Sequence, residues 1–280
     1  EIVEPDHGII TNVGKAHLEG FGSFEGVVRT KGELYDFLRK KSCATADEEK
    51  KPKVFIHGEN EHLMGIAQGL HLIIYGMEDK PEYSVVGTMG ECNPFLNFCW
   101  KRNDGQNLIN HVNSHLIGSY NIYNMLAAAT IGLSFGITEE KISQALANYI
   151  PSNNRSQLTV TQHNKLIVDA YNANPTSMNA ALQNFCNMKV APKMAIIGEM
   201  RELGESSVEE HQRVVDYLKD SDIQEIWLVG EEFSKTTTEF RIFKNVEEVK
   251  QEITKAIPQN LYILIKGSNA TRLFQLPELL

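Results

Sequence analysis

The sequence has no hydrophobic run long enough to cross a membrane. Its longest apolar stretches, Met125–Ser134 and Leu261–Ile265, are much shorter than the ~20 residues that a membrane-spanning helix needs. No leader in which a charged segment precedes an apolar one stands at the N-terminus, so secretion is not indicated. We therefore expect a cytoplasmic protein with no membrane span.

Cysteine and positive charge are both scarce. The four cysteines show neither CxxC pairing nor metal-finger spacing, which is typical of reduced thiols in a cytoplasmic protein: Cys43, Cys92, Cys99 and Cys186. Acidic residues outnumber basic ones by 36 to 27, so the formal net charge is −9. An acidic surface repels phosphate backbones, and nucleic acid is therefore not expected as a partner. A small anion held by a few cations remains possible.

The usual nucleotide-binding loops are also missing. No GxxxxGK[ST] loop occurs, and the GKA at Gly14–Ala16 lacks the hydroxyl that holds magnesium. The segment Gly20–Gly26 misses the dinucleotide fingerprint because its last gap is one residue too long. The chain begins EIVEPDHG, without Met and almost directly before a strand-like segment, which indicates a piece of something longer.

The length of 280 residues predicts two domains, since a typical domain has ~100–200. We place the boundary at the polar run Pro151–Arg155, giving domains over residues 1–150 and 151–280. Hydrophobic patterns in the first domain predict a strand over 8–13, a helix over 23–40, a loop over 41–53, strands and hairpins over 54–117, and helices over 121–134 and 139–149.

Strands and helices alternate regularly in the second domain. Strands are expected over residues 166–171, 194–198, 225–230, 240–243 and 261–267, with helices starting at Pro175 and Ser207 and a third over 245–257. Ser207 and Glu210 have the spacing of a capping box. The alternation predicts an α/β fold with a mainly parallel sheet and right-handed crossovers.

Polar residues and glycines gather where these strands end. They occupy residues 11–12, 169–172, 198–200 and 266–268. Ligands of open α/β sheets bind at the carboxyl ends of the strands, so we expect a site there. Asp169 can accept from a ribose hydroxyl. Asn172 and Asn174 either orient a ligand at a helix N-terminus or merely cap that helix. Lys266 either meets an anionic substrate or forms a structural ion pair.

Four further residues allow two interpretations each. Lys31 shares an apolar stripe, so it either extends its ammonium to water or is desolvated, with a lowered pKa, and open to chemical modification. His17 either shares a site with Lys31 or is an ordinary loop histidine. Arg155 either reaches a phosphate from the domain boundary or is a surface arginine. His211, on an apolar helix face, is expected to be a core or interdomain histidine rather than a catalytic one.

Five segments, in order, resemble the Mur ligase family: ITNVGKAHLEGFGSFEGVVRTKGEL, GSYNIYNMLAAA, DAYNANPTSM, GEMRELGE and ILIKGS. AHLEGFGS, DAYNANP and GEMRELGE are similar to the members that add D-Ala-D-Ala to UDP-MurNAc-tripeptide. The resemblance spans nearly the whole chain and is vaguest over residues 45–110. It implies three domains, of which this chain holds the latter part of the central ATPase domain and the Rossmann-like C-terminal domain. The phosphate loop would then lie before Glu1.

The resemblance implies an activity and its reactants. ATP drives amide bond formation between UDP-MurNAc-tripeptide and D-Ala-D-Ala through an acyl phosphate, in peptidoglycan precursor synthesis, with Mg²⁺ as a second cofactor. The enzyme is expected to be a monomer, and this piece alone to be inactive. The alternatives are a folylpolyglutamate-synthase-like ligase, a nucleotide-binding Rossmann module without catalysis, and a purely structural pair of domains.

The resemblance also implies residue roles. Lys31 matches the lysine that many members carbamylate, and His17 the histidine beside the second magnesium, so both are expected metal ligands. Arg155 matches the arginine that reaches the γ-phosphate, and Lys266 a lysine near the growing end of the substrate. Two sets of residues match nucleotide contacts of the family. On the adenine side these are Tyr120, Asn121 and Asn124. In the nucleotide-side loop of the C-terminal domain they are Asp169, Asn172 and Asn174. Relatives usually have histidine in place of Tyr120, whose ring can still stack on adenine.

Overall fold

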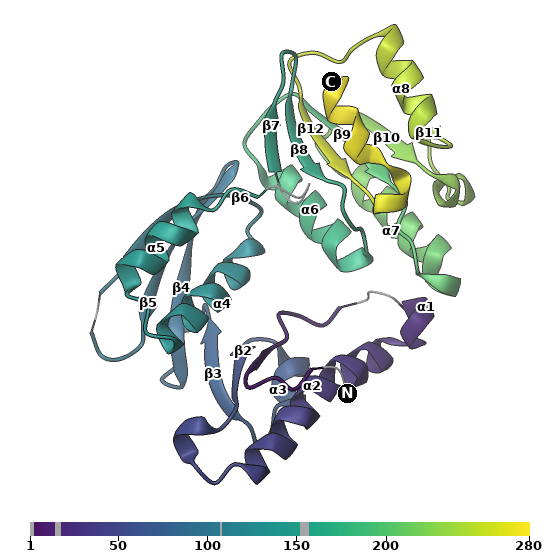
Figure 1. The fold of residues 1–280 in the computed structure, drawn as a ribbon. Coiled ribbons are helices and arrows are strands. Elements are labelled where there is room, and N and C mark those ends of the chain that lie inside the picture. The colour runs from purple at the N-terminus through teal and green to yellow at the C-terminus, as the bar shows by residue number, and fades with distance from the viewer. Residues whose placement is uncertain (1–2, 15–17, 107, 152–156) are drawn as a thin grey trace.

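The described residues form two six-stranded sheets, one after the other along the chain (Figure 1). The structure is a computed structural model and describes residues 3–14, 18–106, 108–151 and 157–280. Helices cover both sheets, so the predicted α/β fold class is confirmed. In the part of the chain that is described, no helix has the length and apolar character needed to span a membrane.

The first sheet is mixed, in the order β1-β2-β3-β4-β5-β6. Its strands are β1 (Gly8–Ile9), β2 (Lys53–His57), β3 (His71–Gly76), β4 (Tyr83–Cys92), β5 (Phe95–Arg102) and β6 (Asn110–Ile117). The first four run parallel, and β5 and β6 complete antiparallel hairpins. The predicted hairpins are thus confirmed for β4 to β6. The parallel pair β2 and β3 is joined instead by a short helix that was not predicted, α3 (Glu61–Ile66).

Three longer helices pack on this sheet: α2 (Phe24–Ala44), α4 (Asn121–Ser134) and α5 (Glu139–Asn148); a short α1 (Leu18–Phe21) precedes α2. The predicted strand over 8–13 is too long, because only Gly8 and Ile9 pair with β2. The predicted end of the helix at residue 40 is wrong, and so is the start of the loop at 41. Lys41 stays helical, and its ammonium pairs with Asp6 at 2.7 Å.

The second sheet has the order β11-β10-β9-β12-β8-β7. Its strands are β7 (Gln157–Val160), β8 (Lys165–Asp169), β9 (Lys193–Gly198), β10 (Glu225–Val229), β11 (Arg241–Phe243) and β12 (Tyr262–Lys266). All neighbours are parallel except β7 and β8, which confirms the mainly parallel sheet. The predicted boundary between residues 150 and 151 falls in the segment between α5 and β7.

Helices lie on both faces of this sheet: α6 (Pro175–Asn187), α7 (Ser207–Lys219) and α8 (Val246–Lys255). Alternate residues of β9 face opposite ways, as the period of a strand requires. Ile197 belongs to the core under α6 and α7, whereas Ile196 belongs to the core under α8. The sheet is therefore covered on both faces, and its ligand-accessible region is the edge where the strands end.

The predicted capping box at the start of α7 is wrong. The helix is preceded by Ser206, whose side chain makes no cap bond to a described residue. Ser207 Oγ donates to Glu232 Oε2 at 2.6 Å instead, and Glu210 accepts from Arg213. Helix α6 does have a capping box, in which Asn174 Oδ1 accepts from the Ser177 N–H and Ser177 Oγ accepts from the Asn174 N–H.

Candidate functional site

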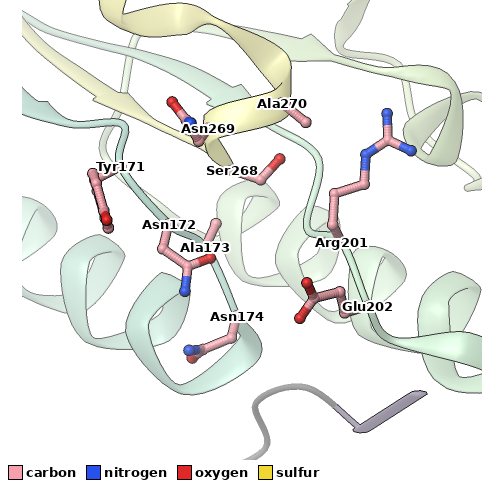
Figure 2. Close-up of a pocket in the computed structure, with 9 residues that line it drawn as sticks. All are labelled: Tyr171, Asn172, Ala173, Asn174, Arg201, Glu202, Ser268, Asn269 and Ala270. Atoms are coloured by element: carbon pink, nitrogen blue, oxygen red, sulfur yellow. The ribbon is translucent and has the colours of Figure 1, made fainter. Parts of the chain in front are cut away.

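A polar cavity of about 220 Å³ opens beside the carboxyl ends of β8, β9 and β12 (Figure 2). The residues that follow these strands line it: Tyr171, Asn172, Ala173, Asn174, Arg201, Glu202, Ser268, Asn269 and Ala270. Two of the four segments predicted to hold the site, 169–172 and 266–268, thus contribute to this cavity, and the residues directly after a third, 198–200, line it too. The fourth, at residues 11–12, follows β1 of the first sheet.

Lys266 and Asp169 form an ion pair at the end of neighbouring strands. The two residues are in register on β12 and β8, and Lys266 Nζ lies 2.8 Å from Asp169 Oδ2. The lysine side chain is 1% exposed and the aspartate 15%. Lys266 Nζ also donates to the carbonyl of Asn172, a lining residue, at 3.2 Å. The structural interpretation of Lys266 is therefore observed, and the pair supports one edge of the cavity.

Asn172 and Asn174 border the cavity on the side of α6, opposite Arg201 and Glu202 (Figure 2). Asn174 is the N-cap of α6, so the capping interpretation is correct for this residue. Its Oδ1 is used by the helix cap, and any ligand in the cavity also lies beside the positive end of the α6 dipole.

Ser268 carries a buried hydroxyl that no described residue hydrogen-bonds. The residue is 4% exposed and lines the cavity, while its backbone N–H donates to the carbonyl of Glu199 at 3.3 Å. An unsatisfied buried hydroxyl costs about 1–3 kcal/mol, so such groups are rare unless something else binds them. This hydroxyl is the strongest sign of a ligand site in the described structure.

The opposite wall of the cavity is a turn formed by Arg201 and Glu202. Both residues belong to the GEMRELGE segment, but the sequence predicted no role for them. Buried Glu199 accepts from Arg201 Nη2 at 2.7 Å and from the Glu232 N–H at 3.1 Å. Glu202 has φ +63°, in the left-handed region that non-glycine residues seldom adopt. Glu199, the acidic residue directly after β9, was the sequence signal for this turn, because a carboxylate at that position can organise the loop that leaves the strand.

His211 is fully buried on α7, in edge-to-face contact with Phe233, as expected for a core histidine. Its Nδ1 lies 2.7 Å from the Ser207 carbonyl, and its Nε2 accepts from the Met200 N–H at 3.0 Å. Burial lowers the pKa of the imidazole below its ordinary value. The ring therefore stays neutral near pH 7.

Lys31 lies at the carboxyl end of β1, where its Nζ donates to the carbonyl of Asn12 at 3.0 Å. Its neighbours on the α2 stripe, Val27 and Leu38, are fully buried, whereas Lys31 is half-buried. This partial burial lowers the pKa of the ammonium group, as the desolvation interpretation predicts. Carbamylation of Lys31 stays a prediction.

The structure describes only some of the other residues expected to contact the nucleotide or the metal. His17 and Arg155 lie outside the described residues. Asn121 Nδ2 donates to the Ile117 carbonyl at 2.8 Å, and its Oδ1 accepts from Asn124. Tyr120, directly before α4, covers Gly118 with its ring. Among the described residues, no group of three or more His, Cys, Asp or Glu side chains is placed to hold a metal ion.

Helix α6 brings the two halves of the chain together. A Cβ atom placed on Gly14 would lie 3.0 Å from Thr176 Oγ1, in the first turn of α6. Asn184, further along the same helix, accepts from the Ser119 N–H at 3.3 Å. The loop after β1 and the turn before α4 therefore both lie beside the helix that starts at the cavity.

The described residues form a mixed sheet followed by a mainly parallel sheet with helices on both faces, which places the chain among α/β proteins with two sheets. The chain belongs to the Mur ligase family: residues 1–132 match the Mur ligase middle domain, and residues 154–269 match the domain described as Mur ligase, glutamate ligase domain.

Within this family, the chain is similar to UDP-N-acetylmuramoyl-tripeptide–D-alanyl-D-alanine ligases. It is 27% identical to the enzyme of Rickettsia prowazekii over 98% of this chain and 60% of that protein. It is also 27% identical to the Escherichia coli enzyme, over 96% of this chain and 58% of the relative. The chain thus spans about 60% of the length of these relatives.

Solved structures give the same result. A MurF crystal structure from Acinetobacter baumannii matches 99% of this chain and 60% of its own, with a TM-score of 0.78 and 26% identity. MurF from Thermotoga maritima in complex with ADP shares the fold, with a TM-score of 0.80 and 20% identity over 99% of this chain and 62% of that one.

Proposed function

We propose that this chain is part of an ATP-dependent ligase that joins D-Ala-D-Ala to UDP-MurNAc-tripeptide in peptidoglycan precursor synthesis. The observation that carries the proposal is the buried, unpartnered hydroxyl of Ser268 in a polar cavity beside α6, the helix that contacts both halves of the chain. The names of the relatives supply the reactants. The reaction is placed in the cytoplasm, and the enzyme acts as a monomer.

The cavity is the proposed site of the incoming dipeptide. D-Ala-D-Ala carries a carboxylate, an amide and an amine, so it needs a cation, donors and acceptors around it. Arg201 contributes a guanidinium with donors beyond the one used by Glu199, and Ser268 and Asn172 contribute a hydroxyl and an amide. Lys266 acts from behind this surface, since its ammonium is neutralised by Asp169 and fixes the Asn172 carbonyl.

The nucleotide is proposed to bind between the two halves. Tyr120, Asn121 and Asn124 border the adenine from the first half. Asp169, Asn172 and Asn174 face the nucleotide from the second half, with Asp169 toward the ribose. Bound ATP and Mg²⁺ supply the phosphoryl group that activates the substrate carboxylate and the positive charge that neutralises it.

We propose that Lys31 and His17 are ligands of the magnesium ion and that Arg155 contacts the γ-phosphate of ATP. An ammonium cannot ligate magnesium, so Lys31 would serve only after its neutral amine has added CO2 and released a proton to form a carbamate. The half-buried position and lowered pKa of Lys31 support that assignment, because the neutral amine is the form that reacts.

Phosphate release by the protein from its complete coding sequence tests this function. We expect release only when ATP, Mg²⁺, UDP-MurNAc-tripeptide and D-Ala-D-Ala are all present, and loss of release when any one is left out. Replacing D-Ala-D-Ala by glutamate, and the muramyl tripeptide by a folate, tests the folylpolyglutamate-synthase-like alternative. Absence of phosphate release with all four reactants present contradicts the proposal.

A further inference from the structure

We propose that His211 is a positioning residue of the cavity, whose neutral imidazole ties together the two ends of the loop 200–207 and so holds the wall formed by Arg201 and Glu202. The inference rests on the proposed function in one respect only, that the cavity receives the amine substrate. His211 itself lies in the core and does not line the cavity as described.

The two imidazole nitrogens contact the two ends of this loop. Nδ1 lies 2.7 Å from the carbonyl of Ser207, so it carries the proton and donates. Nε2 is then unprotonated and accepts from the N–H of Met200 at 3.0 Å. Met200 directly precedes Arg201, and Ser207 is the first residue of α7. One side chain therefore closes the loop that contains the wall.

The wall needs such support because its backbone is unfavourable. Glu202 has a left-handed φ angle of +63°. Gly204, with φ +56°, adopts this region without strain because it has no Cβ atom. A glutamate in this region costs free energy and persists only where the surroundings enforce it. Cavities also lie on both sides of the Arg201–Glu202 turn, since a second one of about 370 Å³ is lined by the same two residues together with Ser207, Glu232 and Lys235.

The identity of the side chain fits this task. An apolar residue could fill the core position against Phe233, whose ring centre is 4.8 Å from that of His211. A buried imidazole is tolerated only when its polar atoms are paired, and both nitrogens here are paired with backbone of the same loop. The polar character of residue 211 thus serves the loop rather than the core.

The support depends on the protonation state. An added proton on Nε2 would face the Met200 N–H, so the hydrogen bond would be lost. The charged groups around the ring are Glu232 and Lys235 of the turn Glu231–Lys235, and Glu199 at the end of β9. Both carboxylates favour the charged ring and Lys235 opposes it, but burial outweighs them and lowers the pKa.

Two substitutions separate positioning from packing. His211→Leu fills the core but removes both hydrogen bonds, whereas His211→Gln places an acceptor near the former position of Nε2. Val215→Ala is the matched control, because Val215 is fully buried on the same helix and belongs to the same core as Phe233. It should weaken the fold without touching the loop.

The first measurement is amide hydrogen exchange in the 280-residue chain. Relative to the core amides of β9, His211→Leu should raise exchange at Met200 about tenfold, as expected for loss of one hydrogen bond. His211→Gln should restore most of the protection, and Val215→Ala should change Met200 no more than it changes the core amides. If His211→Leu and Val215→Ala change the exchange rate of the Met200 amide equally, relative to the core amides of β9, the inference is overturned.

The second measurement is steady-state kinetics of the complete ligase. His211→Leu should raise KM for D-Ala-D-Ala about tenfold while kcat and KM for ATP change less than about twofold. His211→Gln should recover the KM, and acidification should raise KM in the wild type more than in His211→Gln. An unchanged KM in an active enzyme overturns the inference. A wild-type ligase without activity refutes the proposed function instead, and the exchange result still decides whether His211 holds the loop.

Discussion

Lys266 and Asp169 are joined in a buried ion pair, with Nζ 2.8 Å from Oδ2, at the point where β12 and β8 end side by side. The lysine is essentially inaccessible to water, and its other bond fixes the carbonyl of Asn172 at the cavity edge. The pair links the packing of the second sheet to the geometry of the candidate site.

Breaking this pair should destabilise the fold strongly. Lys266→Met leaves the Asp169 carboxylate largely buried without a counter-charge, and such changes cost about 3–5 kcal/mol. The matched control is Lys165→Met, at the opposite end of the same strand pair, where exposed Lys165 contacts Tyr262 OH. Its cost should be below about 0.5 kcal/mol in urea unfolding. Equal losses of unfolding free energy in the two variants would show that the buried ion pair does not stabilise the fold more than an exposed lysine does.

Removing the cap of α6 should affect stability and binding together. Asn174→Ala should lower the free energy of unfolding by about 1 kcal/mol, since it deletes an N-cap. Asn245→Ala deletes the N-cap of α8 and should cost a similar amount. Only the first change should weaken D-Ala-D-Ala binding in calorimetric titration, because only Asn174 lines the cavity. Equal affinities in both variants would contradict a ligand site at α6.

Ser268→Ala should separate binding from folding. The hydroxyl has no partner among the described residues, so its removal should leave the free energy of unfolding within about 0.5 kcal/mol of wild type or increase it. The affinity for the dipeptide should fall about tenfold, as for one lost hydrogen bond. A clear loss of stability with unchanged affinity would assign the hydroxyl a structural role.

Stability should fall on mild acidification because of His211. The pKa of the ring is below its ordinary value of 6.5 in the folded protein, so below that pH the unfolded chain binds the proton first. The free energy of unfolding should therefore decrease as pH falls from about 7 to 5, and the decrease should be smaller in His211→Gln. Urea unfolding at several pH values measures it. Identical slopes in the two proteins would show that His211 is not responsible.

Much of the fold follows from local sequence patterns. The alternation after residue 157 gave the parallel sheet, because strand and helix periods are properties of short segments. The segment-by-segment likeness to Mur ligases anticipated the family that residues 1–132 and 154–269 match. Element ends were less predictable: the helix from residue 24 continues through a charged segment, since contacts such as that of Lys41 with Asp6 are not visible in a local pattern.

The candidate cavity lies at the strand ends where the sequence predicted a site, but its internal bonding was not predicted. Glycines and polar residues at the strand ends indicated this edge of the second sheet. Two of those segments, 169–172 and 266–268, contribute residues to one cavity, and the residues directly after the segment 198–200 line it as well. The capping box expected at Ser207 does not form, because Ser207 Oγ donates to Glu232, 25 residues away. Helix α6 has a capping box instead, between Asn174 and Ser177. Arg201 and Glu202 were given no role, although Glu199, the acidic residue directly after β9, was a local signal for the turn that contains them.

The sequence by itself therefore determined the fold class, the family and the edge of the sheet at which the candidate cavity lies, all of which depend on periodicity and on motifs. Only the tertiary structure decided which polar groups are already satisfied. Lys266 is neutralised by Asp169, His211 is used by the loop 200–207, and Ser268 is left without a partner among the described residues. Partners of this kind come from distant segments, so they meet only once the strands have assembled.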